Sequence, residues 1–123
     1  MFICYSDDGG LSWSKAQRIN DDAAGSHQFF TWMACDPTNG SLHVVFYDRR
    51  AYDDTRTDVY VASSFDCAAT WTNRRVSATP FIPSGKTFFG DYNNISAYEG
   101  KVRPIWTRED YKVLTVWTAL LNF

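Results

Sequence analysis

The sequence predicts an all-β fold made of antiparallel strands. Aromatic residues make up 17% of the chain, β-branched residues are frequent, and no window keeps apolar residues at the spacing of an amphipathic helix. Short β-rich runs alternate with turns such as residues 7–10 and 37–40, whose Gly, Asn and Asp residues supply the positive φ of hairpins. The length of 123 residues corresponds to one domain or to part of one.

Each of the nine expected strands is a short run of β-branched and aromatic residues that ends at a turn signal. Strand neighbours along the chain are close enough to pair as hairpins, so the strands should form an antiparallel meander. In order, the strands are residues 2–6 and 15–19 around Gly9-Gly10, 30–35 and 42–47 around Asn39-Gly40, 58–63 and 72–77 around residues 64–71, 94–98 and 102–106 around Glu99-Gly100, and 113–118.

Two pairs of segments repeat at nearly one period. Residues 6–13 and 64–71 both fit Ser-x-Asp-x-(Gly/Ala)-x-(Ser/Thr)-Trp and begin 58 residues apart, while residues 40–49 match 100–108 at an offset of 60. A repeat of this size with four strands predicts the blades of a β-propeller. Residues 1–123 then form a partial propeller domain, in which 1–20 end one blade, 29–78 form a complete blade and 88–123 supply three strands of a last blade.

The repeated motif predicts a folding device at a hairpin. The Asp carboxylate should accept hydrogen bonds from the turn, the Gly should adopt a φ that a Cβ would strain, and the Trp should cap the apolar core. The second copy has Ala68 where the first has Gly10. The residues predicted to have this structural role are Ser6, Asp8, Gly10, Trp13, Ser64, Asp66 and Trp71.

These two motifs resemble the Asp box, or BNR repeat, of sialidases and other Asp-box propellers. Residues 44–50, 57–62, 88–92 and 100–106 are also similar to the C-terminal blades of bacterial sialidase-like BNR-repeat proteins. The resemblance implies a six-bladed sialidase-like propeller, of which this chain is an incomplete part of about two blades. It also implies an extracellular or periplasmic protein, although residues 1–8 lack the basic start of a signal peptide.

In a meander, alternate loops leave the sheets on opposite faces. The Asp boxes therefore share one face, and residues 26–29, 48–54, 88–93 and 107–111 should share the other, which we call the loop face. These segments are rich in Arg, Asp, Tyr and His, a composition that suits an anionic or polyhydroxylated sugar, because guanidinium groups hold carboxylates and aromatic rings stack on sugar rings.

The resemblance implies an arginine triad for the substrate carboxylate, a Tyr nucleophile activated by a Glu, and an Asp acid/base. Tyr92 is the candidate nucleophile; alternatively, it lines the funnel and hydrogen-bonds Asp91 or the backbone. The arginines could instead anchor loops by ion pairs with Asp48, Asp53 or Asp54, and His27 could be a hydrogen-bonded loop residue. The candidate substrate-binding residues are Arg49, Arg50, Asp48, Asp91, Arg108 and His27.

Three functions remain open. The first is the C-terminal portion of a sialidase-like glycoside hydrolase of the exo-α-sialidase type, inactive as this chain alone because its Phe-Arg-Ile-Pro motif and acid/base loop are not in the sequence. The second is a non-catalytic Asp-box propeller that binds glycan or protein, or acts as a scaffold. The third is a fragment that self-assembles, although nine strands do not close neatly into blades of four.

Composition excludes other classes. The net charge of −2, with no basic cluster beyond two Arg-Arg pairs, argues against nucleic acid, and no apolar run could span a membrane as a helix. Three widely spaced cysteines, expected to be small packing residues, favour neither a disulfide framework nor zinc. The pairs Asp7-Asp8 and Asp21-Asp22 lack the spacing of a calcium loop, so no metal or other cofactor is expected. The expected partners are a sialylated or other acidic glycan and, through open sheet edges, further blades or other copies.

Overall fold

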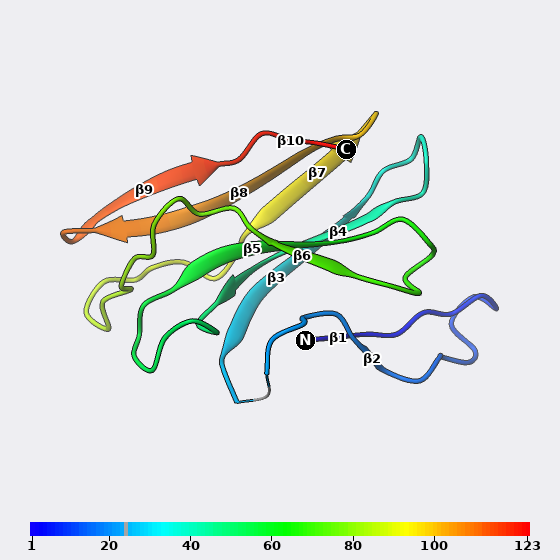
Figure 1. Cartoon of the computed structure of the whole chain (residues 1–123), viewed down its shortest axis with the longest axis horizontal. Coiled ribbons are helices and arrows are strands. Elements are labelled where there is room, and N and C mark those ends of the chain that lie inside the picture. The colour runs from blue at the N-terminus through cyan, green and yellow to red at the C-terminus, as the bar shows by residue number, and fades with distance from the viewer. Residues whose placement is uncertain (24) are drawn as a thin grey trace.

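The computed structural model describes residues 1–23 and 25–123, and every element in them is a β-strand. The all-β, antiparallel prediction is therefore confirmed (Figure 1). The ten strands are β1 Phe2–Ile3, β2 Gln17–Arg18, β3 Gln28–Cys35, β4 Leu42–Asp48, β5 Asp58–Ser64, β6 Thr72–Arg75, β7 Asn94–Tyr98, β8 Lys101–Asp110, β9 Val113–Thr118 and β10 Leu121–Asn122.

The strands form three antiparallel sheets. The first sheet is the β1–β2 hairpin, the second is the meander β3-β4-β5-β6, and the third holds β7, β8, β9 and β10. In the third sheet β9 and β10 pair with the same strand, β8, so β10 continues the path of β9 after an interruption at Ala119 and Leu120. All nine predicted strands are present, and β10 is an addition that the sequence pattern did not reveal.

The strand β8 corrects one prediction about the loop face. Residues 107–110 were expected in a loop, but β8 runs for ten residues to Asp110, and the reversal of the chain is confined to Tyr111 and Lys112, which have φ of 51° and 66°. Cross-strand pairing with β9 holds the polar segment Thr107–Asp110 in the sheet. The prediction was wrong because paired strands accept polar residues that have partners, whatever their intrinsic propensity.

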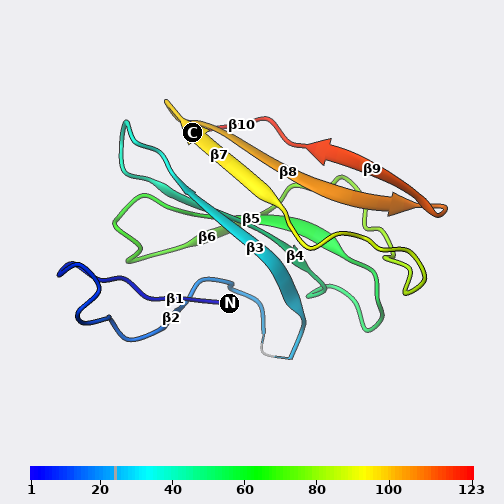
Figure 2. The ribbon, with the colours of Figure 1, turned by 180° about the vertical axis from the view of Figure 1, so that it is seen from behind.

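The second sheet is buried on both faces. Figures 1 and 2 show it between the β1–β2 hairpin and the third sheet. Along β4, Val44 and Phe46 belong to a cluster with Ile19 that includes the first hairpin, whereas Val45 and Tyr47 pack in a cluster with the third sheet. Alternate residues of a strand point to opposite faces, so this uninterrupted apolar run is explained by its position between two layers. Each such side chain contributes roughly 1.5–3 kcal/mol by burial.

Three hydrogen bonds join the second sheet to the third. The Asp36 carboxylate accepts from the backbone N–H of Gly100 at 2.8 Å, and the Asn93 side-chain amide donates to the Phe30 carbonyl at 2.9 Å. The Tyr47 hydroxyl donates to the Thr107 carbonyl at 2.5 Å. The Asp36 bond lies at one end of the contact and the other two lie at the opposite end, so together they fix the relative position of the two sheets as well as satisfying buried polar groups.

The two Asp boxes form the same hydrogen bonds. In the first, Asp8 accepts from the Ser6 hydroxyl at 2.7 Å and from both the backbone N–H and the hydroxyl of Ser12, at 3.0 and 2.6 Å. In the second, Asp66 accepts from Ser64 and Thr70 in the corresponding way, at 2.9, 2.9 and 2.5 Å. These bonds, that from the Ser12 or Thr70 hydroxyl first, lower the pKa of both carboxyls.

The glycine of the first box adopts the positive φ that the motif predicted. Gly10 has a φ of +91°, and Ala68 adopts +67° at the corresponding position of the second box. An alanine in this conformation is strained, and the hydrogen bond from its N–H to the Ser64 hydroxyl at 3.0 Å helps to hold it there.

The two motif tryptophans differ. Trp71 packs against the cluster of Ile19, Val44 and Phe46 as expected, but Trp13 is 65% exposed and caps nothing among the described residues. The cysteines also differ from expectation: all three are exposed thiols and fill no core position. The motif thus specifies the conformation of its loop. Whether its Trp is buried depends instead on whether another sheet packs beside that loop.

Open edges remain at both ends of the stack. β1 pairs only with β2, and β9 pairs only with β8, among the described residues. All six residues of β9 are exposed, including Val113 at 60% and Val116 at 70%. Such an edge offers unpaired backbone groups to another strand.

Replacing Asp66 with alanine should lower the stability of the chain, because one carboxylate organises the whole second box. Asp7→Ala is the matched control, since Asp7 is exposed and makes no side-chain hydrogen bond within the described part of the chain. Urea unfolding followed by tryptophan fluorescence should show a lower midpoint for Asp66→Ala and an unchanged one for Asp7→Ala. Equal midpoints for the two variants would contradict the stabilising role of the second box.

Stability should fall between pH 7.5 and 5.5 because of His43. This ring is fully buried, lies between the Ser41 and Ser63 hydroxyls at 3.0 and 2.8 Å, and stacks on Phe123. Burial lowers its pKa, with Asp36 opposing the shift, so protonation is easier in the unfolded chain. The contribution is complete above the ordinary histidine pKa near 6.5 and declines below it, by at most about 1.4 kcal/mol per pH unit.

The measurement is the urea midpoint of the chain and of His43→Gln at several pH values. The substitution should flatten the dependence in this window, whereas His27→Gln, which leaves His43 in place, should preserve it. A slope that His43→Gln does not alter would assign the pH dependence to another group.

Candidate functional site

The connections of the second sheet place two of the candidate residues, His27 and Arg49, near each other. The backbone N–H of Arg49 donates to the His27 carbonyl at 3.1 Å, which joins the segment before β3 to the segment after β4. A pocket of about 460 Å³ lies between these segments, and we call it the arginine pocket. Its lining residues are Gly25, Ser26, His27, Arg49, Tyr52, Asp53 and Asp54.

Arg49 lines this pocket without a carboxylate partner among the residues that the structure describes. Its Nε–H donates to the Thr57 hydroxyl at 3.1 Å, and its guanidinium lies 5.1 Å from the centre of the Phe29 ring. These contacts orient the side chain but leave its charge uncompensated by an acid. A half-buried guanidinium in this state is suited to bind an anion such as a carboxylate.

Tyr52 and two acids form the other side of the arginine pocket. The Tyr52 hydroxyl donates to Asp58 at 2.8 Å, and burial together with this bond raises its pKa. Asp54 pairs with Arg56 at 2.9 Å, and Asp53 is exposed beside it. The lining of the pocket therefore includes one arginine together with carboxylates that could accept hydrogen bonds from ligand hydroxyls.

Arg50 differs from its neighbour in every contact. Its guanidinium pairs with Asp48 at 2.8 Å, contacts Asp21 of the segment after β2, and lies 4.2 Å from the Tyr60 ring centre. Asp48 is fully buried and also accepts from the Arg50 backbone N–H at 2.6 Å. The charges of Asp48 and Arg50 thus compensate each other, and the contact with Asp21 joins the loop after β4 to the segment after β2. These contacts agree with the alternative in which the arginine anchors a loop by an ion pair.

Arg108 is likewise held by internal partners. It lies in β8 with 9% of its surface exposed, pairs with Asp110 at 2.5 Å and donates to the Thr79 carbonyl at 2.6 Å. Its guanidinium also lies over the Phe81 and Trp117 rings. The structure therefore places this candidate in the sheet contact and leaves it no donor directed at the arginine pocket.

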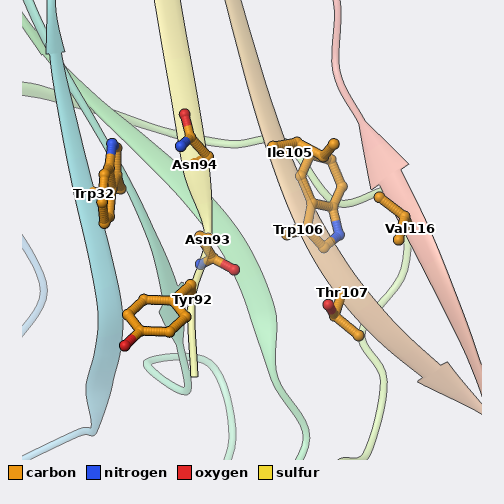
Figure 3. Close-up of a pocket in the computed structure, with 8 residues that line it drawn as sticks. All are labelled: Trp32, Tyr92, Asn93, Asn94, Ile105, Trp106, Thr107 and Val116. Atoms are coloured by element: carbon orange, nitrogen blue, oxygen red, sulfur yellow. The ribbon is translucent and has the colours of Figure 1, made fainter. Parts of the chain in front are cut away.

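Tyr92 and Asp91 lie elsewhere, just before β7. Tyr92 is 77% exposed, and its hydroxyl makes no hydrogen bond to any described residue, Asp91 included. It lines a second pocket of about 500 Å³, which we call the aromatic pocket (Figure 3). The aromatic pocket is lined by Trp32, Tyr92, Asn93, Asn94, Ile105, Trp106, Thr107 and Val116, none of which lines the arginine pocket.

Sequence reasoning missed the two tryptophans of the aromatic pocket, whereas Asn93 lies in the segment 88–93 that was predicted on the loop face. Trp32 and Trp106 carried only strand signals, and they meet because β3 contacts β7, which pairs with β8. No pattern of spacing could bring these two positions together, since they are 74 residues apart.

No group of three or more His, Cys, Asp or Glu side chains in the described residues is arranged to hold a metal ion. The same residues contain no helix long and apolar enough to cross a membrane. Of the two Asp pairs weighed as a calcium site, Asp21 and Asp22 contact Arg50 and Arg18.

The two adjacent arginines should differ sharply in their effect on stability. Arg50→Met leaves the buried Asp48 carboxylate without its cation and should lower the free energy of unfolding by about 3 kcal/mol. Arg49→Met removes no ion pair and should lower it by less than about 1 kcal/mol. Urea unfolding of both variants tests this contrast, and similar losses in the two would contradict the assignment of Arg50 as the structural arginine.

The chain matches no protein-family model, no curated protein and no solved structure. What the chain does is therefore inferred from its own residues and their arrangement.

Proposed function

We propose that the chain is part of a sialidase-like Asp-box β-propeller and that its loop face binds an acidic sugar. Two Asp boxes with matching hydrogen bonds, at the period of the repeat, support the propeller. The stacking of three antiparallel sheets, with the middle one buried on both faces, supports it as well. In this proposal the protein acts outside the cytoplasm, where sialylated glycans are exposed.

The observation that carries the sugar proposal is the state of Arg49. Arg50 and Arg108 each pair with an aspartate, whereas Arg49 lines a pocket and has no acidic partner in the described part of the chain. Burying a charge without compensation is unfavourable, so a half-buried guanidinium at a pocket is suited to an anionic ligand. A sugar carboxylate would receive two parallel N–H donors from it.

The rest of the arginine pocket suits the remainder of such a ligand. Asp53 offers an exposed carboxylate to ligand hydroxyls, and the imidazole of His27 adds a group that can donate or accept. A pocket of about 460 Å³ is within the range of small-molecule sites. One arginine with polar neighbours fits recognition of a single acidic residue at the end of a glycan.

The separation of the two pockets favours binding over catalysis by this chain. A sialidase-type nucleophile and the arginine that holds the carboxylate must act on the same sugar ring. Tyr92 lines the aromatic pocket and Arg49 the arginine pocket, without a shared lining residue. The chain therefore fits a glycan-binding part of a propeller, and hydrolysis, if the longer protein performs it, needs groups supplied by other segments.

The test is a titration of the chain with the α-methyl glycoside of N-acetylneuraminic acid, followed by NMR shifts and calorimetry. Arg49→Met should weaken binding by about tenfold or more, as expected for loss of a charge-assisted hydrogen-bond pair. Arg74→Met is the matched control, since Arg74 is an exposed arginine on β6 that does not line the arginine pocket. Equal effects of the two variants would mean that binding depends only on the net charge of the chain, and this result would refute the site.

The same protein should release no 4-methylumbelliferone from its sialoside. Release that Tyr92→Phe abolishes would replace the binding proposal with a catalytic one. Absence of both binding and turnover would refute the acidic-sugar proposal.

A further inference from the structure

The guanidinium of Arg49 is held by one of its three nitrogens. The Nε–H donates to the Thr57 hydroxyl at 3.1 Å, which is the one hydrogen bond that this side chain makes to a described residue. The guanidinium carbon lies 5.1 Å from the centre of the Phe29 ring, so an aromatic contact supports the same orientation. The two Nη groups are left without a partner among the described residues.

These two Nη groups can be reached by a ligand. Within the described part of the chain, the buried side-chain nitrogen and oxygen atoms that lack a hydrogen bond are Trp71 Nε1, Asn93 Oδ1 and Trp106 Nε1. Arg49 is half-buried, and neither of its Nη atoms belongs to this set. Because both Nη groups lack a partner and are not buried, they are accessible from the arginine pocket that Arg49 lines.

The core fixes the position of Thr57. The residue is fully buried, its backbone N–H donates to the Phe81 carbonyl at 2.8 Å, and its carbonyl accepts from the Phe81 N–H at 3.0 Å. Phe81 belongs to the apolar cluster between the second and third sheets. The place of the Thr57 hydroxyl is therefore set by the core and not by the loop that carries Arg49.

The hydrogen of the Thr57 hydroxyl is already engaged. It is donated to the Thr55 carbonyl at 3.0 Å, so the oxygen meets the Arg49 Nε–H as an acceptor. A hydroxyl has one hydrogen and two acceptor positions, and this arrangement uses the hydrogen and one of the two positions. The direction of every hydrogen bond in the series from Arg49 to Thr57 to Thr55 is thus determined.

Engagement of Nε determines how Arg49 meets an anion. A carboxylate pairs with a guanidinium in one of two ways, through Nε and one Nη or end-on through both Nη groups. The first way needs the Nε–H that Thr57 occupies. The second uses the two accessible groups, and each carboxylate oxygen then accepts from one of them.

We propose that Thr57 is a positioning residue of the arginine pocket, and that it makes Arg49 bind a sugar carboxylate end-on through its two Nη groups. This inference rests on the acidic-sugar function proposed for the same pocket. Thr57 does not line the pocket and acts through Arg49. Because the guanidinium is oriented before the ligand arrives, less side-chain entropy is lost on binding.

The first experiment needs no ligand. It follows the exchange of the Arg49 Nε–H with water by NMR, with the signal identified by its loss in Arg49→Met. In the unaltered chain this exchange should be about tenfold slower than that of Arg74, which is exposed and makes no side-chain hydrogen bond to a described residue. This comparison does not depend on the folding of any variant.

Three substitutions then separate the hydroxyl from the shape of the side chain. Thr57→Val removes the acceptor and should speed the Arg49 exchange about tenfold, whereas Thr57→Ser keeps the hydroxyl and should leave it nearly unchanged. Thr55→Val is the matched control, since it makes the same chemical change on an exposed side chain that does not line the pocket. It should alter neither exchange nor binding.

The second experiment titrates the same chains with the α-methyl glycoside of N-acetylneuraminic acid and with its methyl ester. Thr57→Val should weaken binding of the acid roughly three- to tenfold, and Thr57→Ser should restore it. The ester keeps the sugar but not the charged carboxylate. Its weaker binding should therefore not depend on residue 57.

Each failure has its own signature. Exchange at Arg49 as fast as at Arg74, or equal in Thr57→Val and Thr57→Ser, would overturn the positioning role whether or not a sugar binds. Slower exchange with binding that Thr57→Val does not weaken would make the hydrogen bond merely structural and would also overturn it.

If the glycoside does not bind the unaltered chain, the acidic-sugar function fails, and acetate decides the rest. Acetate carries the carboxylate alone. Shifts of the Arg49 side-chain signals that Thr57→Val weakens would uphold the end-on site for a carboxylate. Absence of such shifts would overturn it.

Discussion

The burial of both faces of the second sheet is the constraint on which the rest of the structure depends. Because Val44 and Phe46 pack on one side and Val45 and Tyr47 on the other, β4 needs a layer on each of its faces. The β1–β2 hairpin provides one layer and the third sheet provides the other. Neither of these outer layers has such a core of its own, so the position of every loop follows from their packing on β4 and its neighbours.

The same packing determines which arginines are available to a ligand. Arg50 contacts Asp21 in the segment after β2, while Arg108 in β8 pairs with Asp110 and donates to the Thr79 carbonyl in the connection between the second and third sheets. Both are therefore part of the joints between layers. Arg49 lies in the same connection as Arg50 but lines the arginine pocket and pairs with no acid among the described residues, and so its charge remains open to solvent and to a ligand. Three chemically identical side chains thus differ in their availability to a ligand, because each one meets different neighbours in the folded chain.

Local patterns predicted most of the fold. The alternation of β-rich runs with turn residues located nine strands, and the Asp-box motif predicted hydrogen bonds that both loops form. The parts that depend on pairing between strands could not be predicted in this way. Residues 107–110 have the composition of a polar loop, yet pairing with β9 holds them in β8. Adjacent Arg49 and Arg50 could not be told apart, since the partner Asp21 is 29 residues away. Trp106 carried only a strand signal, because the lack of a partner for its indole N–H is a property of the folded interior.

The hydrogen bonds between the second and third sheets have a consequence for how the chain unfolds. Asn93 is bonded across the joint to Phe30, and Tyr47 and Asp36 secure the same contact. The two sheets cannot separate without exposing these polar groups together with the apolar cluster between them. They therefore open as one cooperative unit rather than one sheet at a time.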